Sequence, residues 1–312
     1  MSLIGMAIRR KLLAISPQEA LFARRGFVVT SHVRRARLEL IGGTFIDGYN
    51  AWLAGKLGYA LSSLMPGLHG FAVEGAAMAA ALLDHLTPWN RRRLARLLEE
   101  RPEHRYMIHV GAGWAAARLR RSLRRAVASR HPVLGWLVAD GWGFHQAYFS
   151  PRRWATGQRA LPARAGYLAR AVDQGIGRAL WFVAGAHPDR VAEHVAKFAA
   201  VRRPDLWSGV GLAATYAGGD SRKELARLVG LAGELRPHLV QGAAFAAAAR
   251  VVAGNVTVWT DETAQAIAGR SAAELARVSL AHEPTPPVPS SGDAYEGWRA
   301  RVREELAMKE VA

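Results

Sequence analysis

The apolar residues of this chain recur mostly at the three- and four-residue spacing of helices that bury one face. Val191, Val195 and Phe198 form one such stripe. Residues 251–259 are the only run that resembles a strand, and a Gly-Asn pair interrupts it. The pattern therefore predicts an all-α protein.

Helix boundaries can be predicted from the turn and capping residues. Pro188 and Pro204 lie where two helices are expected to begin, because proline is tolerated in the first turn. The glycines at 218–219 are expected to end the second of these helices. Ser221 and Ser271 are each followed three residues later by Glu, which is the pattern of a capping box at a helix start.

A short motif recurs along the chain: a glycine, any residue, a small residue, a bulky residue and then usually an alanine. The copies begin at Gly75, Gly111, Gly141, Gly175, Gly209 and Gly242, with a looser one at Gly48. Subtracting the six positions gives spacings of 36, 30, 34, 34 and 33 residues, which is the period of two-helix repeats. We therefore expect tandem helical hairpins of about 34 residues that form a curved α-solenoid or a closed α/α toroid.

The same signals divide the chain into four parts. We expect an N-terminal arm and first helix at 1–30, a helical-repeat domain at 31–282, a proline-rich linker at 283–293 and a C-terminal helix at 294–312. Residues 150–166, rich in Pro, Gly and Arg, are expected to form a long loop within the repeat domain.

The charge and the absence of cysteine narrow the possible chemistry. No cysteine is present, which excludes disulfides, thiolate metal sites and cysteine nucleophiles. The net charge of +17 fits an anionic partner such as nucleic acid, a membrane surface, an acyl carrier protein or a phosphorylated substrate. It also fits solvated helix faces encoded by a GC-rich genome. We favour the second interpretation, because the basic residues are spread along the chain, and nucleic acid is not an expected partner.

Neither a signal peptide nor a transmembrane segment is expected. Residues 2–8 are apolar, but the basic run at 9–11 follows them, which reverses the order of a signal peptide. The longest uncharged stretch, 57–73, is interrupted by Pro66 and Gly67. We therefore expect a cytoplasmic protein.

Polar residues often lie one or two positions before the motif glycine. They are Asp47, Glu74, His109, Asp140, Asp173, Gln174, Ser208 and Gln241. If every motif begins the equivalent helix of its hairpin, these side chains gather along one rim or one concave face. They are then either helix caps, favoured by the positive end of the helix dipole, or a functional cluster. Both interpretations are left open by the pattern.

The functional interpretation assigns acid–base chemistry to this cluster. Carboxyl and imidazole groups beside an apolar surface can act as general acids and bases, because burial moves their pKa values toward neutrality. Asp140, His145, Glu74 and Asp173 are the candidate proton-handling residues, with Arg178 as an anion anchor and His109, Asp47, Trp142 and Gln241 as further substrate-binding candidates. An apolar wall is expected from Trp114, Trp142, Phe144, Tyr148, Trp181, Trp207 and Tyr216.

No cofactor or metal is predicted from sequence motifs. The His and acidic residues match no metal-ligand spacing. The chain also has no P-loop, no dinucleotide-binding G-x-G-x-x-G between a strand and a helix, and no G-x-S-x-G elbow. Standard nucleotide and serine-hydrolase chemistry is therefore not expected.

Several of these segments resemble the signature runs of a bacterial family of unknown function. They are 24–27, 70–78, 109–114, 140–145, Phe149 with 151–153, 173–178, 206–211 and 241–246, and the resemblance covers residues 22–282. Members of that family are encoded in biosynthetic loci for enediynes and other polyketides. The resemblance implies a role in specialised metabolism and supplies no catalytic residues.

Three functions remain open at this point. The first is an enzyme or binding protein for a hydrophobic polyene or polycyclic intermediate, acting as a cyclase or isomerase. The second is a non-catalytic helical-repeat scaffold whose groove binds a partner or an acidic carrier protein. The third is nucleic-acid binding through the Arg clusters at 118–125 and 152–170, and it has the weakest support. Buried carboxyl groups around a closed apolar pocket would favour the first function over the second.

Overall fold

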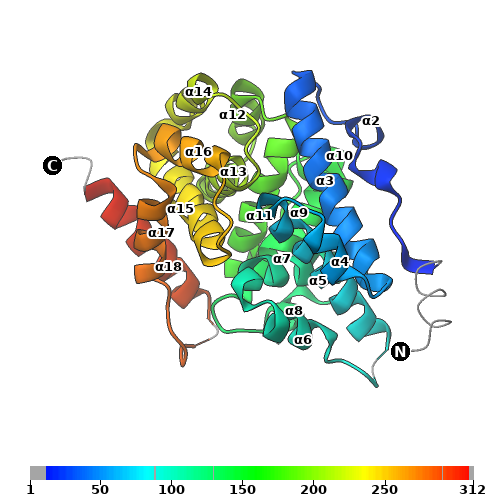
Figure 1. Ribbon diagram of the computed structural model, residues 1–312. Helices are drawn as coiled ribbons and strands as arrows, with labels where there is room; N and C mark the ends of the chain where they lie inside the picture. Colours follow the sequence, from blue (N-terminus) through cyan, green and yellow to red (C-terminus); the bar gives the residue numbers. More distant parts are fainter. Residues whose placement is uncertain (1–11, 88, 129, 290, 309–312) are drawn as a thin grey trace.

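The computed structural model describes residues 12–87, 89–128, 130–289 and 291–308, and these residues contain helices and no strand (Figure 1). Seven long helices follow one another: α3 (His32–Leu53), α5 (His69–Leu86), α7 (Arg105–Arg118), α9 (Trp136–Phe149), α11 (Tyr167–Val183), α13 (Arg203–Ala217) and α15 (Arg236–Val252). Each long helix packs against the next, and α17 (Ala272–Ala281) continues the row beside α15. The all-α prediction is confirmed for the described residues.

Shorter helices connect the long ones. They are α4 (Leu57–Ser62), α6 (Arg93–Glu100), α8 (Leu123–Ala128), α10 (Pro151–Trp154), α12 (Pro188–Ala196), α14 (Arg222–Ala232) and α16 (Val258–Ala268). Most of the long helices are buried over most of their length, whereas α6 and α12 each bury one apolar stripe. The core therefore lies among the long helices, and the short helices cover its edge.

The row of long helices bends until early helices contact late ones. Arg37 on α3 donates a hydrogen bond from Nε to the carbonyl oxygen of Ala217 on α13, at 2.8 Å. Arg250 on α15 donates from Nη1 to the carbonyl oxygen of Gly67, just before α5, at 2.6 Å. Early and late members of the row are consequently in direct contact.

The motif glycines lie inside the long helices, at the points where these helices touch. A Cβ atom on Gly175 would lie 1.9 Å from the carbonyl oxygen of Asp140 on the preceding long helix. A Cβ atom on Gly177 would lie 2.0 Å from the carbonyl oxygen of Leu206 on the following one. The same clash would occur with the preceding helix at Gly75, Gly111, Gly141, Gly209 and Gly242, and with the following helix at Gly48, Gly113, Gly143 and Gly211. Only glycine fits at these positions, where Cα–H groups face carbonyl oxygens across the interface.

The prediction that the motifs mark helix starts is therefore wrong. Gly75 lies well inside α5, which begins at His69, and Gly175 lies well inside α11, which begins at Tyr167. Glu74 and Asp140 also lie inside helices, so the interpretation of these carboxyl groups as caps is wrong as well. The physical reason is that close backbone approach is needed where helices cross, not where they begin.

The other boundary predictions largely agree with the structure. Pro188 and Pro204 lie in the first turns of α12 and α13, and Gly218 follows α13 with a φ of +68°. Ser271 forms a reciprocal capping box with Glu274, and Ser221 accepts a hydrogen bond from the Glu224 N–H group. Residues 251–259 form the end of α15, a turn and the start of α16, while 150–166 include the short helix α10.

The two ends of the described chain pack against the row. Residues 12–27, with α2 (Phe22–Arg25), lie along α3, where Asn50 accepts a hydrogen bond from the Ile15 N–H group at 3.0 Å. At the other end, α18 (Gly292–Met308) packs against α15 and α17 (Figure 1). The apolar stretch 2–8, the basic run 9–11 and residues 309–312 lie outside the described residues.

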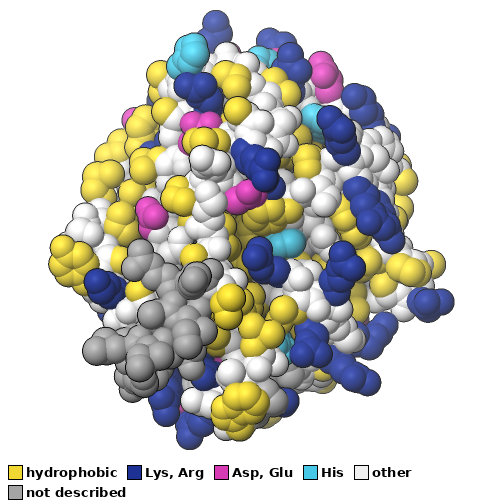
Figure 2. Space-filling view, turned by 90° about the vertical axis from the view of Figure 1, so that its right-hand side faces the viewer, with side chains coloured by type: hydrophobic (Ala, Val, Ile, Leu, Met, Phe, Trp, Pro, Cys, Tyr) yellow, Lys and Arg dark blue, Asp and Glu magenta, His cyan; other side chains and the backbone are white. Residues whose placement is uncertain are grey.

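One described stretch, Pro66–Leu86, is long and apolar enough to cross a membrane by length and composition alone. Its most apolar window is 83% buried inside the protein, as expected for a core helix. Figure 2 shows the face that carries α2 and α3, where Lys and Arg outnumber Asp and Glu and a recess near the middle exposes hydrophobic side chains.

Candidate functional site

Two small cavities lie between the long helices. The first, called here the aromatic cavity, has a volume of about 50 Å³, and the second has a volume of about 30 Å³. Arg178, Leu212 and Tyr216 line both of them. Aromatic side chains make up much of the wall of the first cavity: Phe45, Phe71, Trp114, Phe144, Tyr148, Phe149, Phe182 and Tyr216. The cavities therefore offer an apolar interior with few polar groups.

The repeat explains which side chains line these cavities. The bulky position of the motif, three residues after its first glycine, is occupied by Trp114, Phe144, Arg178, Leu212 and Phe245 in successive long helices. The first four line the aromatic cavity, and the last three line the second cavity. Because the glycines fix the register of neighbouring helices, equivalent positions meet in the interior. Arg178 thus places a guanidinium group at the motif position where the other four of these copies carry an apolar side chain.

Glu74 provides a buried carboxyl group at the wall of the aromatic cavity. Its side chain comes from α5, is 2% exposed and lines the cavity wall. The Oε1 atom is buried and has no hydrogen-bond partner among the described residues. Burial raises the pKa of Glu74 to about 7, with a further increase from Asp140, although Arg178 and Trp114 act in the opposite direction. The group is therefore able to take up or release a proton near neutral pH.

Arg178 and Tyr216 are two further polar residues at this wall, to which Glu19 and Tyr148 also contribute. Burial opposes the charge of Arg178, but the carboxyl groups of Asp140 and Glu74 raise its pKa, so it remains a cation. Its guanidinium group lies 4.7 Å from the centre of the Phe144 ring. The hydroxyl of Tyr216 is buried without a hydrogen-bond partner among the described residues. The cavity thus presents a protonatable carboxyl, a cation and a free hydroxyl within an apolar enclosure.

Asp140 lies behind Arg178, and both of its carboxyl oxygens accept hydrogen bonds. Its Oδ1 atom accepts a hydrogen bond from Arg178 Nη1, and its Oδ2 atom accepts one from Gln174 Nε2 at 2.8 Å. Asp140 is 1% exposed and lines neither cavity. The arrangement orients Arg178 rather than offering Asp140 to a ligand.

The hydrogen bonds continue from Gln174 through equivalent positions of later repeats. Ser208 lies 3.4 Å from Gln174 Oε1 and donates to Gln241 Oε1 at 2.9 Å. Gln241 Oε1 also accepts from Arg299 Nε of α18 at 3.2 Å. The polar residues directly before four successive motif glycines, Asp140, Gln174, Ser208 and Gln241, therefore form a continuous buried row.

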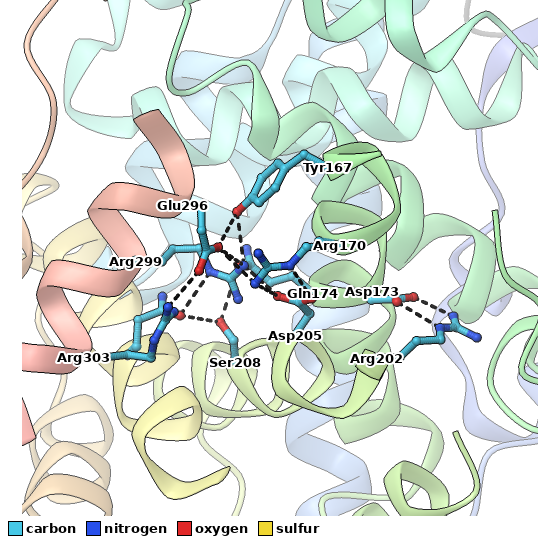
Figure 3. Close-up of polar contacts among 11 residues, drawn as sticks. Tyr167, Arg170, Asp173, Gln174, Arg202, Asp205, Ser208, Glu296, Arg299 and Arg303 are labelled. Atoms are coloured by element: carbon cyan, nitrogen blue, oxygen red, sulfur yellow. Dashed lines mark hydrogen bonds and ion pairs between the residues drawn. The ribbon is translucent and has the colours of Figure 1, made fainter. Parts of the chain in front are cut away.

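An ion-pair cluster connects this row to α18 (Figure 3). Arg299 is completely buried and pairs with Asp205 at 2.7 Å and with Glu296 at 3.0 Å. Burial opposes the charge of Glu296, but Arg299, Arg303 and Arg170 lower its pKa to about 2. Each of these charges has an ion-pair partner, so the cluster fixes α18 against the row, and Nη2 of Arg299 and Nη1 of Arg303 are left without a hydrogen-bond partner among the described residues.

Asp173 does not join the cavity. It lies one position before Gln174 on α11, and this offset turns its side chain away, toward Arg202 (Figure 3). The two carboxyl oxygens accept hydrogen bonds from Arg202 at 2.6 and 2.9 Å. Burial raises the pKa of Asp173, while Arg202 acts against the increase. The structure therefore separates Asp173 from Glu74, Arg178 and Asp140.

The two histidine candidates also lie outside the cavity walls. His145 on α9 packs edge-on against Trp114, with ring centres 5.5 Å apart, and its Nδ1 atom has no hydrogen-bond partner among the described residues. His109 is 5% exposed, and its Nδ1 atom lies 2.7 Å from the carbonyl oxygen of Arg105. Burial lowers the pKa of His145 to about 3 and that of His109 to about 4, so both rings are neutral at pH 7.

Of the remaining candidates, Asp47 is exposed on α3. Trp142 packs edge-on against Trp154, with ring centres 5.3 Å apart, and lines neither cavity. Trp181 and Trp207 are buried but are also absent from the two cavity walls. The structure thus brings Glu74 and Arg178 together at the cavity, with Asp140 behind them and Gln241 farther along the polar row.

Arg250 and the N-terminal segment were not identified from the sequence. Arg250 is 0% exposed and lies 3.9 Å from the centre of the Tyr216 ring, and among the described residues it forms no ion pair with a carboxylate. Ile15 and Glu19 contribute to the wall of the aromatic cavity from the N-terminal segment. Neither feature lies at a position that the repeat marks, so no signal in the motif points to them.

No group of three or more His, Asp or Glu side chains that could bind a metal occurs within the ranges that the structure describes. Neither the curated proteins nor the solved structures contain a match to this chain. Residues 4–306 match the sequence model of the family described as "Protein of unknown function (DUF1702)", so the chain belongs to this family.

Proposed function

We propose that the protein binds a hydrophobic polyene or polycyclic biosynthetic intermediate in the aromatic cavity and transfers a proton to or from it, as a cyclase or isomerase does. The observation that carries the proposal is the carboxyl group of Glu74, which is buried with a free Oε1 atom in an aromatic enclosure beside Arg178. Buried carboxyl groups around an apolar pocket support catalysis over a scaffold with an open groove.

Each group has a defined role in this proposal. Glu74, with a pKa of about 7, donates a proton to a double bond or removes one next to a carbonyl group. Arg178 binds a carbonyl or carboxylate oxygen, since its one hydrogen bond to a described residue goes to Asp140. The aromatic rings contact the apolar part of the substrate and stabilise positive charge that develops on it. Asp140 is a positioning residue for Arg178.

Substrate entry requires the cavity to expand. A volume of about 50 Å³ has room for a few water molecules and is too small for a polyene. Ile15 and Glu19 form part of the cavity wall, and they belong to the segment 12–27 that lies along α3. We infer that this segment moves outward when the substrate binds.

We also infer that the long helices close into an α/α toroid rather than an open solenoid. The contacts from Arg37 to Ala217 and from Arg250 to Gly67, which join early and late helices, support this shape. A compact chain of 312 residues has a radius of gyration of about 20 Å. Small-angle X-ray scattering should give this value, whereas an open solenoid would give a clearly larger one.

The catalytic proposal can be tested by complementing a producing strain from which the gene has been deleted. The deletion should cause a hydrophobic intermediate to accumulate. Wild-type protein should restore the product, whereas Glu74→Gln, which has nearly the same shape and cannot transfer the proton, should not. Glu234→Gln, at an exposed position, is the matched control and should restore the product.

Folding of each variant should be checked by circular dichroism and thermal unfolding of the purified protein. Restoration of the product by Glu74→Gln at the wild-type level would overturn the acid–base assignment. If the Arg178→Lys variant folds correctly and does not restore the product, the result would support the anchoring role of Arg178. Lys cannot reproduce the bidentate hydrogen bonding of a guanidinium group.

A further inference from the structure

A separate cleft lies away from the aromatic cavity, between the C-terminal end of α5 and helix α8. Helix α8 is found in the lower part of Figure 1. It has a volume of about 480 Å³ and is lined by Asp84, His85, Arg91, Arg121, Arg125 and Arg130, together with two small residues. His85 lies eleven residues after Glu74 on the same helix, which corresponds to about 16 Å along its axis. The cleft is therefore separate from the proposed catalytic site.

The cationic groups of this cleft lack counter-charges. Arg91, Arg121 and Arg125 form no ion pair with any other residue that the structure describes. Arg130 is partly buried, and its Nε atom has no hydrogen-bond partner among the described residues. Four guanidinium groups thus face a concave space without a matching set of carboxylates.

Asp84, the carboxylate in the wall of this cleft, already accepts hydrogen bonds from Arg93 and Leu94. Its oxygen atoms accept hydrogen bonds from the N–H groups of Arg93 and Leu94, at 3.2 and 3.1 Å, and from the Arg93 side chain at 3.2 Å. The Arg93 guanidinium group, which does not line the cleft, forms an ion pair with Asp84 at 3.2 Å, and Asp84 also acts against the burial that lowers the pKa of Arg130. One carboxylate therefore stands against four guanidinium groups at the cleft wall, which leaves an excess of positive charge.

We propose that this cleft binds the phosphate or diphosphate group of a ligand. Guanidinium groups donate paired hydrogen bonds to phosphate oxygens, and several of them can surround a group with two or more negative charges. A carboxylate would need only one or two of the four arginines. The volume accommodates a diphosphate group together with part of the molecule that carries it. The proposal is independent of the chemistry at Glu74.

The phosphate group can come from a soluble phosphorylated compound or from a lipid headgroup. Trp89, which is 82% exposed, and Leu86, which is 46% exposed, lie next to the cleft residues in the chain. Exposed Trp and Leu beside arginines are also found where proteins contact an anionic membrane surface. The test therefore needs two separate binding experiments, one for a soluble phosphate compound and one for a lipid headgroup.

Isothermal titration of the full chain with inorganic pyrophosphate tests the soluble source. The variant R121A/R125A removes two exposed guanidinium groups of the cleft, and R152A/R222A removes two exposed ones from α10 and α14 as a charge-matched control. We expect wild type and control to bind alike and R121A/R125A to bind at least tenfold more weakly. Affinity should also decrease as the salt concentration rises.

Cosedimentation with phosphatidylcholine vesicles, with and without phosphatidylglycerol, tests the lipid source. Binding only to the anionic vesicles, weakened in R121A/R125A but not in R152A/R222A, would assign the phosphate to a lipid headgroup and support the site. The proposal is overturned if neither pyrophosphate nor the anionic vesicles bind. It is equally overturned if both double variants lose binding to the same extent, since the effect would then reflect net charge alone.

Discussion

Gln174 donates a hydrogen bond of 2.8 Å to Asp140, and the two residues occupy the same place in successive repeats, directly before the motif glycine and 34 residues apart. The glycines set this register, because they allow neighbouring helix backbones to touch at fixed positions. Asp140 in turn binds Arg178, which reaches the aromatic cavity. A repeat selected for packing therefore also positions the charged groups of the candidate site.

The glycine contacts predict a strong difference between two Gly→Ala substitutions. Gly175→Ala would place a Cβ atom 1.9 Å from a backbone carbonyl oxygen, and the helices would have to separate. We expect a loss of about 3 kcal/mol in the free energy of unfolding. Gly43→Ala on α3 meets no atom within 4 Å and should stabilise the protein by about 0.5–1 kcal/mol. Urea unfolding measures both, and equal effects would contradict the packing role of the motif.

The raised pKa of Glu74 predicts how stability changes with pH. The carboxyl group has a pKa of 4.5 in an unfolded chain and about 7 in the folded protein, so the folded state binds the proton more tightly. The contribution of this proton binding to the free energy of unfolding is complete below pH 4.5 and is lost as the pH rises through 7. The stability of wild type relative to Glu74→Gln should fall by about 3 kcal/mol over this interval.

Urea unfolding at several pH values measures this difference, with Glu234→Gln as the control for an exposed carboxyl group. The control should differ from wild type by a constant, small amount. A difference between wild type and Glu74→Gln that does not depend on pH would contradict the protonation equilibrium assigned to Glu74.

The buried pair of Arg178 and Asp140 should show strong coupling. Arg178→Met leaves the Asp140 carboxylate buried without its cation, which should cost about 3–5 kcal/mol. Asp140→Asn in the same protein removes the stranded charge and should recover about 2 kcal/mol of that loss. A double-mutant cycle in urea measures the coupling. Additive effects of the two substitutions would show that the residues act independently.

The sequence predicts the helical class and the repeat because both depend on local, periodic patterns. The motif glycines, the capping box at Ser271 and the proline-marked starts of α12 and α13 are all visible in it. Glu74 and Arg178 could also be selected as candidates, since they occupy marked positions of the motif. The glycines permit close approach of neighbouring helices, but the prediction of helix starts is wrong because these crossing points lie inside the helices.

Other features depend on contacts that no local pattern encodes. Asp140 and Asp173 look equivalent in sequence, but a shift of one residue turns Asp173 toward Arg202. Arg250 meets Gly67 only because the row of helices bends back on itself. The N-terminal segment reaches the cavity from far away in the chain, through contacts with α3. These relationships are fixed by tertiary packing and could not be predicted from one sequence.

The N-terminal segment should control access to the aromatic cavity, and Asn50 holds it in place. The side chain of Asn50 accepts from the Ile15 N–H group at 3.0 Å and donates to the Ile15 carbonyl oxygen at 2.9 Å. Asn50→Ala removes both hydrogen bonds, each worth about 1 kcal/mol, so the segment should open more often. We expect a neutral apolar dye such as Nile red to bind and dissociate about tenfold faster in stopped-flow fluorescence. Asp47→Ala, exposed on the same helix, is the control and should leave both rates unchanged. Unaltered rates in Asn50→Ala would show that ligands enter the cavity by another route, because the loss of both hydrogen bonds to Ile15 would then leave access unchanged.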